Sequence, residues 1–329
     1  MQTSDPAPDA VVELDKGFDD LYSRVLAPAL APHEAERKRL ISQAIRQLLI
    51  AGGGGLVLGA TVGLLARDIG LAWLGLAIPV AIVGFMAWGR LQRFRTSCKT
   101  EALTGLAQAI GLTYQCEGFD PDGLKRLRQL ALLPGYERSH FEDRFSGRRD
   151  ACDFQLYEAR LEAQEGSGKN SHWVTVFGGQ VVCIAFPKKF LGTTVVNREG
   201  VRALGVPGLE RVNLESGDFE RIFEVYGTDQ VEARYLVHPV FMEKLVALEN
   251  ALGGAKLRCA FDAGELMVAV EGGDLFEIVD LWQPLPSKET ARTGVDGISH
   301  VLKLIDAVLS TPANPFADPK PAGQPAAGA

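Results

Sequence analysis

Residues 48–89 read LLIAGGGGLVLGATVGLLARDIGLAWLGLAIPVAIVGFMAWG, and this stretch decides the architecture of the chain. It contains two uncharged apolar runs, Leu48–Ala66 and Ile69–Gly89, separated only by Arg67 and Asp68. Each run is about 20 residues long, the length at which an α-helix spans roughly 30 Å of hydrocarbon. Helices of soluble proteins normally carry a polar stripe, which both runs lack. We therefore prefer two membrane spans, joined as an antiparallel hairpin, to the alternative of a helical hairpin buried in a soluble protein.

Positive charge flanks the outer ends of the two runs, whereas the turn between them holds one arginine beside one aspartate. Because Lys and Arg concentrate on the cytoplasmic side of a membrane, we expect a multi-pass protein with both termini in the cytoplasm. Trp73 and Trp88 lie near opposite ends of the second run, where aromatic rings favour the two interfaces. The flanking basic residues are Arg37, Lys38, Arg39, Arg46, Arg90, Arg93, Arg95 and Lys99.

Gly55, Gly59 and Gly63 recur at four-residue spacing in the first run, so they share one helix face. A face of small residues lets another helix approach closely. Two partners fit it: the second run of the same chain, which we prefer, or another copy of the chain in a homo-oligomer. Because neither run contains an ionisable residue, we expect no ion or proton path through the hairpin.

The segments around the hairpin differ in composition. Residues 1–16 are polar and acidic without the apolar core of a signal peptide, and residues 311–329 are rich in Pro and Ala; we expect both tails to be disordered. Residues 17–47 predict an amphipathic helix, interrupted by Pro28 and Pro32, and then a charged helix that leads into the first span. The amphipathic helix has few basic residues, so we expect it to pack on the soluble part of the chain rather than on lipid.

Residues 97–310 predict a cytoplasmic α+β domain with a mixed or antiparallel sheet, because strand and helix patterns alternate irregularly rather than as βαβ units. Gly178-Gly179 between two apolar runs predicts a tight hairpin turn. Asp229, with Glu232 three residues later, predicts a helix start with a capping box, and Pro239 suits the first turn of the next helix. Strands are predicted at residues 112–116, 152–161, 173–177, 180–186, 193–196, 211–214, 257–261 and 266–270, and further helices at 96–110, 122–130 and 295–309.

Composition and motifs argue against several classes of function. A net charge of -7 without blocks of like charge gives no footprint for binding nucleic acid. Residues 166–170, GSGKN, lack the full pattern of a phosphate-binding loop and predict a hairpin loop. His140, Glu142 and Asp143 have a spacing that matches no standard ligand motif, so a solvated loop or a charged patch is the preferred interpretation.

The remaining histidines and cysteines give no catalytic signature either. His172, His238 and His300 each stand alone, without an identifiable partner for acid–base work. The five cysteines are scattered without C-x-x-C spacing, which predicts free thiols rather than disulfides or a zinc site. We therefore predict no catalytic, cofactor-binding or metal-binding residue. The cysteines are Cys98, Cys116, Cys152, Cys183 and Cys259.

Residues 223–236 read FEVYGTDQVEARYL and are followed by Pro239 and by FME at residues 241–243. This segment resembles the hallmark of a bacterial membrane-protein family known as domain of unknown function 3137. The two N-terminal spans also look like that family, although His238 stands where Thr is expected. Supporting matches are FEDRFSG at residues 141–147, LYEA at 156–159 and FPK at 186–188.

The resemblance implies a bacterial inner-membrane protein with a cytoplasmic α+β domain and no established activity, so it carries over no catalytic residue. We expect a membrane-anchored interaction or scaffold domain that contacts the lipid bilayer and a protein partner. The alternative is a membrane-associated hydrolase that acts on a lipid or peptide through an undetected site. In the hallmark, Val231, Tyr235 and Leu236 are expected to be buried. We prefer a structural role for the hallmark; if it also forms a partner surface, its polar members Gln230, Glu232 and Arg234 are the candidates.

Overall fold

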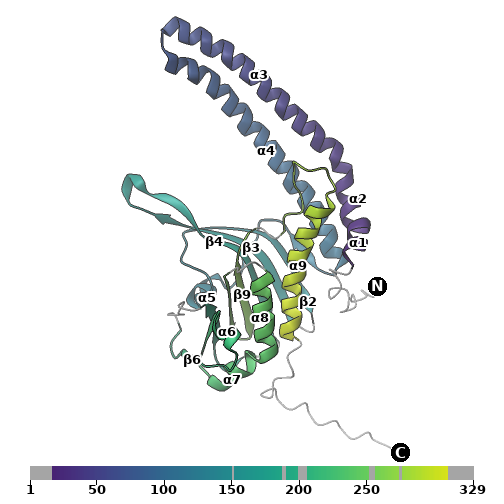
Figure 1. Ribbon diagram of the computed structural model, residues 1–329, viewed down its shortest axis with the longest axis vertical. Helices are drawn as coiled ribbons and strands as arrows, with labels where there is room; N and C mark the ends of the chain where they lie inside the picture. The colour runs from purple at the N-terminus through teal and green to yellow at the C-terminus, as the bar shows by residue number, and fades with distance from the viewer. Residues whose placement is uncertain are drawn as a thin grey trace, which may run out of the picture. The chain divides into compact units, whose positions relative to one another are not determined.

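The computed structural model describes residues 17–149, 152–186, 190–198, 206–251, 256–273 and 276–309 (Figure 1). The chain divides into two compact units. Among the described residues, a helical unit contains residues 17–110 and 276–296, and a sheet unit contains residues 111–273 and 297–309. The predicted tails at residues 1–16 and 311–329 lie outside the described residues.

The helical unit is built on two long antiparallel helices. The first runs from Phe18 to Ala66 without a break, and the second, α4, is Ile69–Ala109. The predicted interruption at Pro28 and Pro32 is wrong, because the first helix continues through both residues. Each lies in the first turn of a short segment, where a missing backbone N–H is tolerated, so the helix changes its winding and continues. The segments of the first helix are α1 (Phe18–Leu21), η2 (Tyr22–Leu26), α2 (Ala27–Leu30), η3 (Ala31–His33) and α3 (Glu34–Ala66).

The turn between α3 and α4 is the predicted pair Arg67-Asp68. Arg67 takes a left-handed conformation (φ 52°) that ends α3, and its backbone N–H donates to the carbonyl oxygen of Gly63. Asp68 caps α4, because its Oδ1 accepts from the backbone N–H of Gly70 at 2.7 Å. Two residues therefore reverse the chain.

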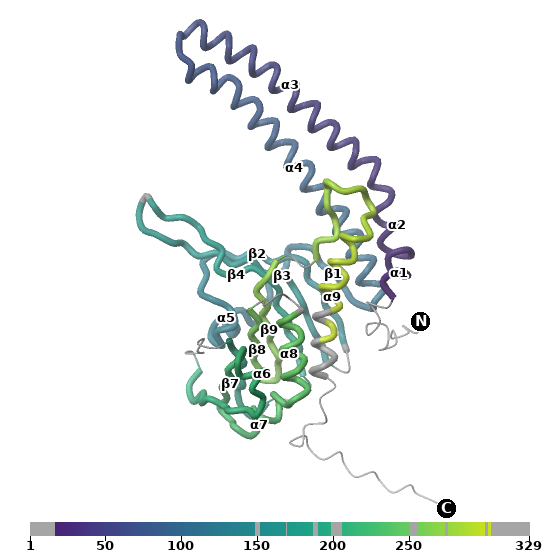
Figure 2. The backbone as a smooth tube through the Cα atoms, in the orientation of Figure 1, coloured from purple at the N-terminus to yellow at the C-terminus, as the bar shows by residue number. Residues whose placement is uncertain are grey.

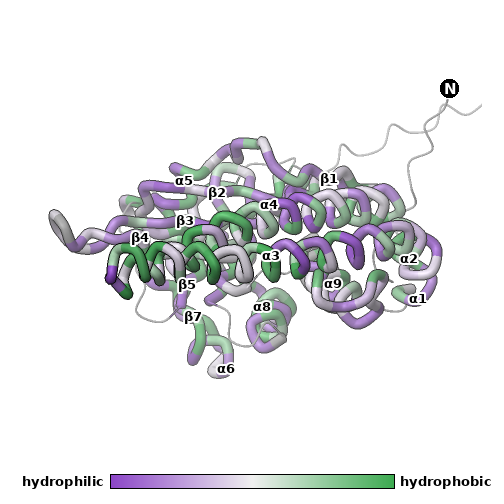
Figure 3. The backbone as a smooth tube through the Cα atoms, turned by 90° about the horizontal axis from the view of Figure 1, so that it is seen from above, coloured by the Kyte–Doolittle hydropathy of each residue, from purple (hydrophilic) through white to green (hydrophobic). Residues whose placement is uncertain are grey.

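Around this turn the hairpin exposes large apolar side chains. Leu65, at 83% exposed, and Phe85, at 81%, are extreme examples of a surface that covers both helices. Figure 3 shows the hydrophobic colour concentrated on the part of α3 and α4 nearest their turn. Both helices are long and apolar enough to cross a membrane. The exposed members include Ile45, Leu49, Ile50, Leu56, Val57, Leu64, Ile69, Trp73, Leu74, Ile78, Ile82, Met86 and Trp88.

Away from the turn, the same two helices bury their apolar residues. Phe18, Leu26 and Leu30 on the first helix are buried, as are Leu91 and Phe94 on α4. Residues 276–296 belong to the same unit and bond to the first helix: the Tyr22 hydroxyl donates to the Pro286 carbonyl oxygen at 3.2 Å, and Arg37 donates to the Leu281 carbonyl oxygen at 2.8 Å. The predicted separate helix at residues 96–110 is the end of α4, so the sheet unit begins at Gly111 rather than at residue 97.

Within the described residues, the sheet unit holds nine strands in the order β1-β2-β3-β4-β9-β8-β5-β7-β6 (Figure 2). Every pairing is antiparallel, which confirms the α+β class and decides for an antiparallel rather than a mixed sheet. The strands are β1 (Thr113–Gln115), β2 (Arg138–Arg149), β3 (Cys152–Glu165), β4 (His172–Ala185), β5 (Thr194–Arg198), β6 (Glu210–Val212), β7 (Phe223–Gly227), β8 (Leu257–Asp262) and β9 (Glu265–Glu271).

Helices cover both faces of this sheet. On one face, α5 (Leu124–Gln129) contributes Leu127 to a core with Tyr157 and Met267. Arg126 of α5 also holds Asp262 at the end of β8 with two bonds of 2.6 Å. On the other face lies α8 (Pro239–Ala251), whose Phe241 ring is 5.4 Å from that of Phe261. The other helices are α6 (Gly217–Glu220), α7 (Gln230–Leu236), the short η4 (Gly168–Asn170) and α9 (Lys288–Leu309), which the unit boundary divides at Gly297.

Strand β4 corrects the predicted hairpin turn at Gly178-Gly179. The strand continues through both glycines and pairs with β3 on both sides of one register irregularity between Leu161 and Glu162. Gly179 pairs with Glu271 of β9, and a Cβ there would lie 2.0 Å from the carbonyl oxygen of Val270. The glycine therefore permits a close approach of two strands. Before Gly179, β4 pairs with β3 alone, so the two strands form a projecting ribbon whose tip, residues 166–170, is the predicted hairpin loop (Figure 1).

Candidate functional site

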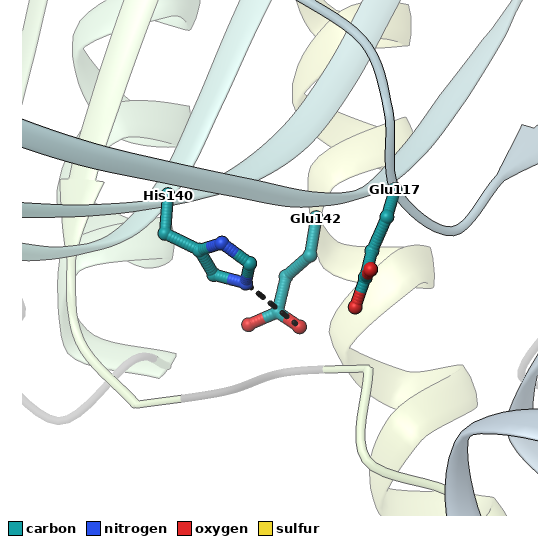
Figure 4. Close-up of side chains that lie close together, drawn as sticks. All are labelled: Glu117, His140 and Glu142. Atoms are coloured by element: carbon teal, nitrogen blue, oxygen red, sulfur yellow. Dashed lines mark ion pairs between the residues drawn. The ribbon is translucent and has the colours of Figure 1, made fainter. Parts of the chain in front are cut away.

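Three side chains with metal-ligand chemistry converge near the β1–β2 edge of the sheet. One carboxylate oxygen each of Glu117 and Glu142 and one ring nitrogen of His140 all lie within 4.8 Å of one another. Figure 4 shows His140 and Glu142 projecting from the same side of one strand, with the Glu117 carboxylate turned toward them. The His140 Nε2 is 3.9 Å from a Glu142 oxygen. We call these three residues the rim cluster.

A β-bulge in β2 separates the rim cluster from Asp143. The pairing of β2 with β3 shifts between Glu142 and Phe145, and Asp143 adopts φ 55°. Asp143 is 0% exposed and accepts a 2.5 Å bond from the Tyr114 hydroxyl. Burial, together with the Asp143 carboxylate, raises the pKa of Tyr114. The interpretation of His140, Glu142 and Asp143 as a solvated loop is therefore wrong, because all three lie on β2. Asp143 is buried apart from the other two, and Glu117 lies beside them instead.

A row of polar side chains continues inward from the rim cluster. Glu142 is the register partner of Glu158 on β3, and Glu158 is the partner of Gln180 on β4, so the three lie on one face of the sheet. Gln180 is 1% exposed, and its Nε2 donates to Glu158 Oε1 at 2.9 Å and to the Gly273 carbonyl oxygen at 2.8 Å. Within the described part of the chain, Gln180 Oε1 has no hydrogen-bond donor. The Gln180 amide, which donates two hydrogen bonds, thus orients the buried carboxyl group of Glu158.

Cys98, Cys183 and Cys259 are poor candidates for a nucleophile. Burial raises the pKa of Cys98 to about 11 and that of Cys183 to about 12, and it also raises the pKa of Cys259. A thiol with a raised pKa stays protonated at neutral pH and is a poor nucleophile. None of the five cysteines forms a disulfide, as expected. These thiols therefore give no support to a hydrolase with a cysteine nucleophile.

The glycine face predicted for a helix partner lies against α4 of the same chain. A Cβ on Gly55 would lie 3.1 Å from the Leu76 backbone, and one on Gly63 would lie 2.6 Å from the Ala72 Cβ. The corresponding distance from Gly59 to the Ala72 carbonyl oxygen is 2.3 Å. In this chain the glycine face thus packs closely against α4.

The candidate partner surface is divided by the structure. The Gln230 and Arg234 side chains lie at the surface of α7, where each forms one bond to a backbone oxygen. Glu232 is only 2% exposed, and its two carboxylate oxygens accept from the backbone N–H groups of Leu191 and Gly192, both at 2.7 Å. Glu232 is therefore a structural anchor for the segment before β5 and is not part of the exposed surface.

The hallmark segment forms β7 and α7, with some departures from the predicted burial. Asp229 caps α7 as expected, accepting from the backbone N–H groups of Val231 and Glu232. Glu232 does not close the capping box, because its carboxylate holds the segment before β5 instead. Val231 is 64% exposed rather than buried. The buried apolar residues of α7 and its end are Ala233 and Val237, and Tyr235 and Leu236 are half-buried.

Comparisons with known proteins add one family and one structure. No curated protein matches the chain. A crystal structure of the mycobacterial trehalose monomycolate transport factor A, TtfA, aligns with 61% of this chain and 92% of its own at 11% sequence identity. Its TM-score of 0.32 does not establish a shared fold.

The family model described as protein of unknown function (DUF3137) matches residues 175–309. These residues include the hallmark segment but not the supporting segments at 141–147 and 156–159. The resemblance seen in the sequence is confirmed over residues 175–309, the part of this chain that is similar to the DUF3137 family.

Proposed function

We propose that this protein is a membrane-anchored interaction or scaffold domain of a bacterial inner membrane, with the hairpin crossing the bilayer and the sheet unit in the cytoplasm. The observation that carries the proposal is the exposed apolar surface of α3 and α4. A soluble protein rarely exposes so large a contiguous apolar surface, whereas lipid solvates it favourably.

The apolar surface ends at the same level on both helices. Gln47 and Arg90 lie at this level, because Arg90 donates to Gln47 Oε1 at 2.6 Å. Beyond this pair, buried residues such as Leu91 and Phe94 replace exposed apolar ones. A shared polar boundary on two antiparallel helices is the pattern expected where both leave the hydrocarbon on one side.

Charge supports the proposed orientation. Arg39, Arg46 and Arg93 are exposed on the side of this boundary away from the turn, where they can meet anionic headgroups. Arg37 and Arg95 are instead engaged in ion pairs with Glu34 and Glu277. The exposed arginines therefore carry the positive-inside argument, and they favour a cytoplasmic location for both ends of the hairpin.

Gln230 and Arg234, with the exposed Val231 beside them, are the proposed contact for a protein partner. Val231 gives this part of α7 an apolar centre between two polar side chains, the combination that small protein interfaces use. Because Glu232 points inward to Leu191 and Gly192, the surface does not include it.

Cysteine labelling tests the anchor and its orientation. In spheroplasts, a membrane-impermeant maleimide should label Arg67→Cys in the turn, whereas Ser167→Cys at the tip of the β3–β4 ribbon should react only after the membrane is permeabilised. Labelling of Ser167→Cys in intact spheroplasts would reverse the orientation. Full-length chain that stays in the supernatant after ultracentrifugation without detergent would overturn the anchor.

Crosslinking followed by affinity purification tests the partner surface. A protein recovered with the wild-type chain should be lost from the double variant Gln230→Ala/Arg234→Ala and retained by Arg221→Ala, which alters an exposed arginine on another segment. If the double variant recovers the same proteins in the same yield as wild type, α7 is not the contact.

A further inference from the structure

We propose that the rim cluster of Glu117, His140 and Glu142 binds a divalent transition-metal ion of the zinc class. Imidazole nitrogen and carboxylate oxygen are ligands that such ions accept together. The three ligand atoms lie within 4.8 Å of one another. In a tetrahedral zinc site, ligand atoms lie about 3.4 Å apart, so small side-chain rotations bring these three into range.

Strand pairing and hydrogen bonds hold the backbone that carries the rim cluster. His140 and Glu142 are two residues apart on β2, which puts both on the same face of a strand that pairs with β3. Glu117 follows β1, and this segment is tied to the β2 bulge by the bond from the Asp143 N–H to the Cys116 carbonyl oxygen at 2.9 Å. The Gln115 amide also donates to the Glu117 carbonyl oxygen at 3.2 Å. Ligands on paired strands keep their positions better than ligands on free loops.

The row behind the cluster gives an independent reason for a cation. Glu142 and Glu158 are direct cross-strand partners, an arrangement of like charges that destabilises a sheet. Gln180 stabilises this arrangement: its Nε2 donates to Glu158, while its buried Oε1 has no donor within the described residues. Glu117 and Glu142 bring two carboxyl groups to one imidazole. A divalent cation at the rim offsets their mutual repulsion.

The ligand set favours a zinc-class ion over calcium or magnesium. Ca²⁺ takes six to eight oxygen ligands and Mg²⁺ about six, whereas the rim cluster offers two carboxylates and one nitrogen. The three protein ligands leave the fourth coordination position of a tetrahedral zinc ion open to solvent. Water can occupy that position, as in zinc sites with three protein ligands. Glu117 and His140 are exposed, so an ion reaches the cluster directly from solution.

Equilibrium dialysis of the detergent-purified full chain, without a histidine tag, tests the site, with Zn²⁺ as the probe and metal quantified by mass spectrometry. The wild-type chain should bind one ion saturably at neutral pH. His140→Ala and Glu117→Ala should each weaken binding at least about tenfold. His172→Ala is the matched control, because His172 is an exposed histidine on the β3–β4 ribbon, outside the cluster, and it should bind like wild type.

Absence of saturable Zn²⁺ binding by the wild type would overturn the proposal. So would equal binding by His140→Ala, or equal loss in His172→Ala. Tighter binding of Ca²⁺ than of Zn²⁺ would overturn the assignment to the zinc class. Thermal unfolding without metal checks that each variant folds, and the two ligand variants are independent, so one misfolded variant leaves the other as the test.

Discussion

Gly59 and Gly75 face each other where α3 and α4 pack: a Cβ added to Gly75 would lie 2.7 Å from the Cα of Gly59. Side chains do not approach a backbone this closely, so the separation of the two helices depends on glycine at both positions. Small residues at a crossing allow dispersion contacts along the backbones, which drive helix association in lipid. The α3–α4 contact is therefore encoded by particular residues and not only by hydropathy.

Gly59→Ile should loosen the hairpin, because the new side chain meets the Ala72 carbonyl oxygen. A clash of this kind destabilises a packed contact by about 1–3 kcal/mol. Thermal unfolding in detergent should show a midpoint lower by several degrees. Gly53→Ile is the matched control, since nothing lies within 4 Å of a Cβ at that position in the same helix. Equal midpoints for the two variants would contradict the observed packing.

Glu34 should make the helical unit sensitive to acid. The bond from Arg37, reinforced by the Leu285 N–H, outweighs burial and lowers the pKa of Glu34 from 4.5 to about 2. A depressed folded-state pKa gives stability that is complete above pH 4.5 and is lost as the pH falls toward 2. Glu34→Gln should therefore lower the unfolding midpoint at neutral pH and flatten its acid dependence. The exposed Glu36→Gln should keep the wild-type profile, and a wild-type slope in Glu34→Gln would refute this role.

Glu232→Gln should release the segment before β5. An amide keeps one acceptor oxygen but places an NH₂ group against a backbone N–H, so one of the two bonds to Leu191 and Gly192 is lost. Leaving a buried donor unsatisfied costs about 1–3 kcal/mol. Hydrogen–deuterium exchange of the peptide that contains Leu191 and Gly192 should accelerate about tenfold. Glu243→Gln, on the exposed side of α8, should leave that exchange unchanged; unchanged exchange in both variants would count against the anchor.

Gly179→Ala should destabilise the sheet, because the added methyl group would meet the Val270 carbonyl oxygen. We expect a loss of about 1–3 kcal/mol in the free energy of unfolding. Gly178→Ala, one residue away, meets only the Thr175 side chain at an ordinary 3.8 Å and should change stability by less than about 0.5 kcal/mol. Denaturant titration of the two variants distinguishes a continuous β4 from a turn, for which the two glycines would not differ in this way.

The hairpin could be predicted from sequence because its signal is local: two uncharged runs of sufficient length and a charged two-residue turn. Strand β2 was missed because its bulge breaks the alternation. Phe141 pairs with Ala159 and Phe145 with Leu156, so the bulge puts two residues that are four apart on opposite faces of the sheet, and period-two counting fails. Gly178-Gly179 was misinterpreted because the close approach of β9 is a tertiary contact that sequence does not display.

The rim cluster could not be predicted from the spacing of its residues in the sequence. His140 and Glu142 are visible as an i, i+2 pair, but Glu117 joins them only because β1 pairs with β2. The prediction of a capping box that includes Glu232 was wrong for a related reason. Its spacing from Asp229 fits a capping box, yet two free N–H groups from a distant segment bind its carboxylate instead. In both cases the deciding partner comes from elsewhere in the chain.

The unbroken length of α4 has a mechanical consequence. The helix has 41 residues, and its last 20 or so, from Arg90 to Ala109, extend about 30 Å past the proposed lipid boundary. Helices tilt when the thickness of a bilayer changes. A tilt of about 10° moves the distant end of such a lever by about 5 Å. In the proposed orientation, α4 is thus also a mechanical arm, through which bilayer thickness becomes a displacement at Ala109.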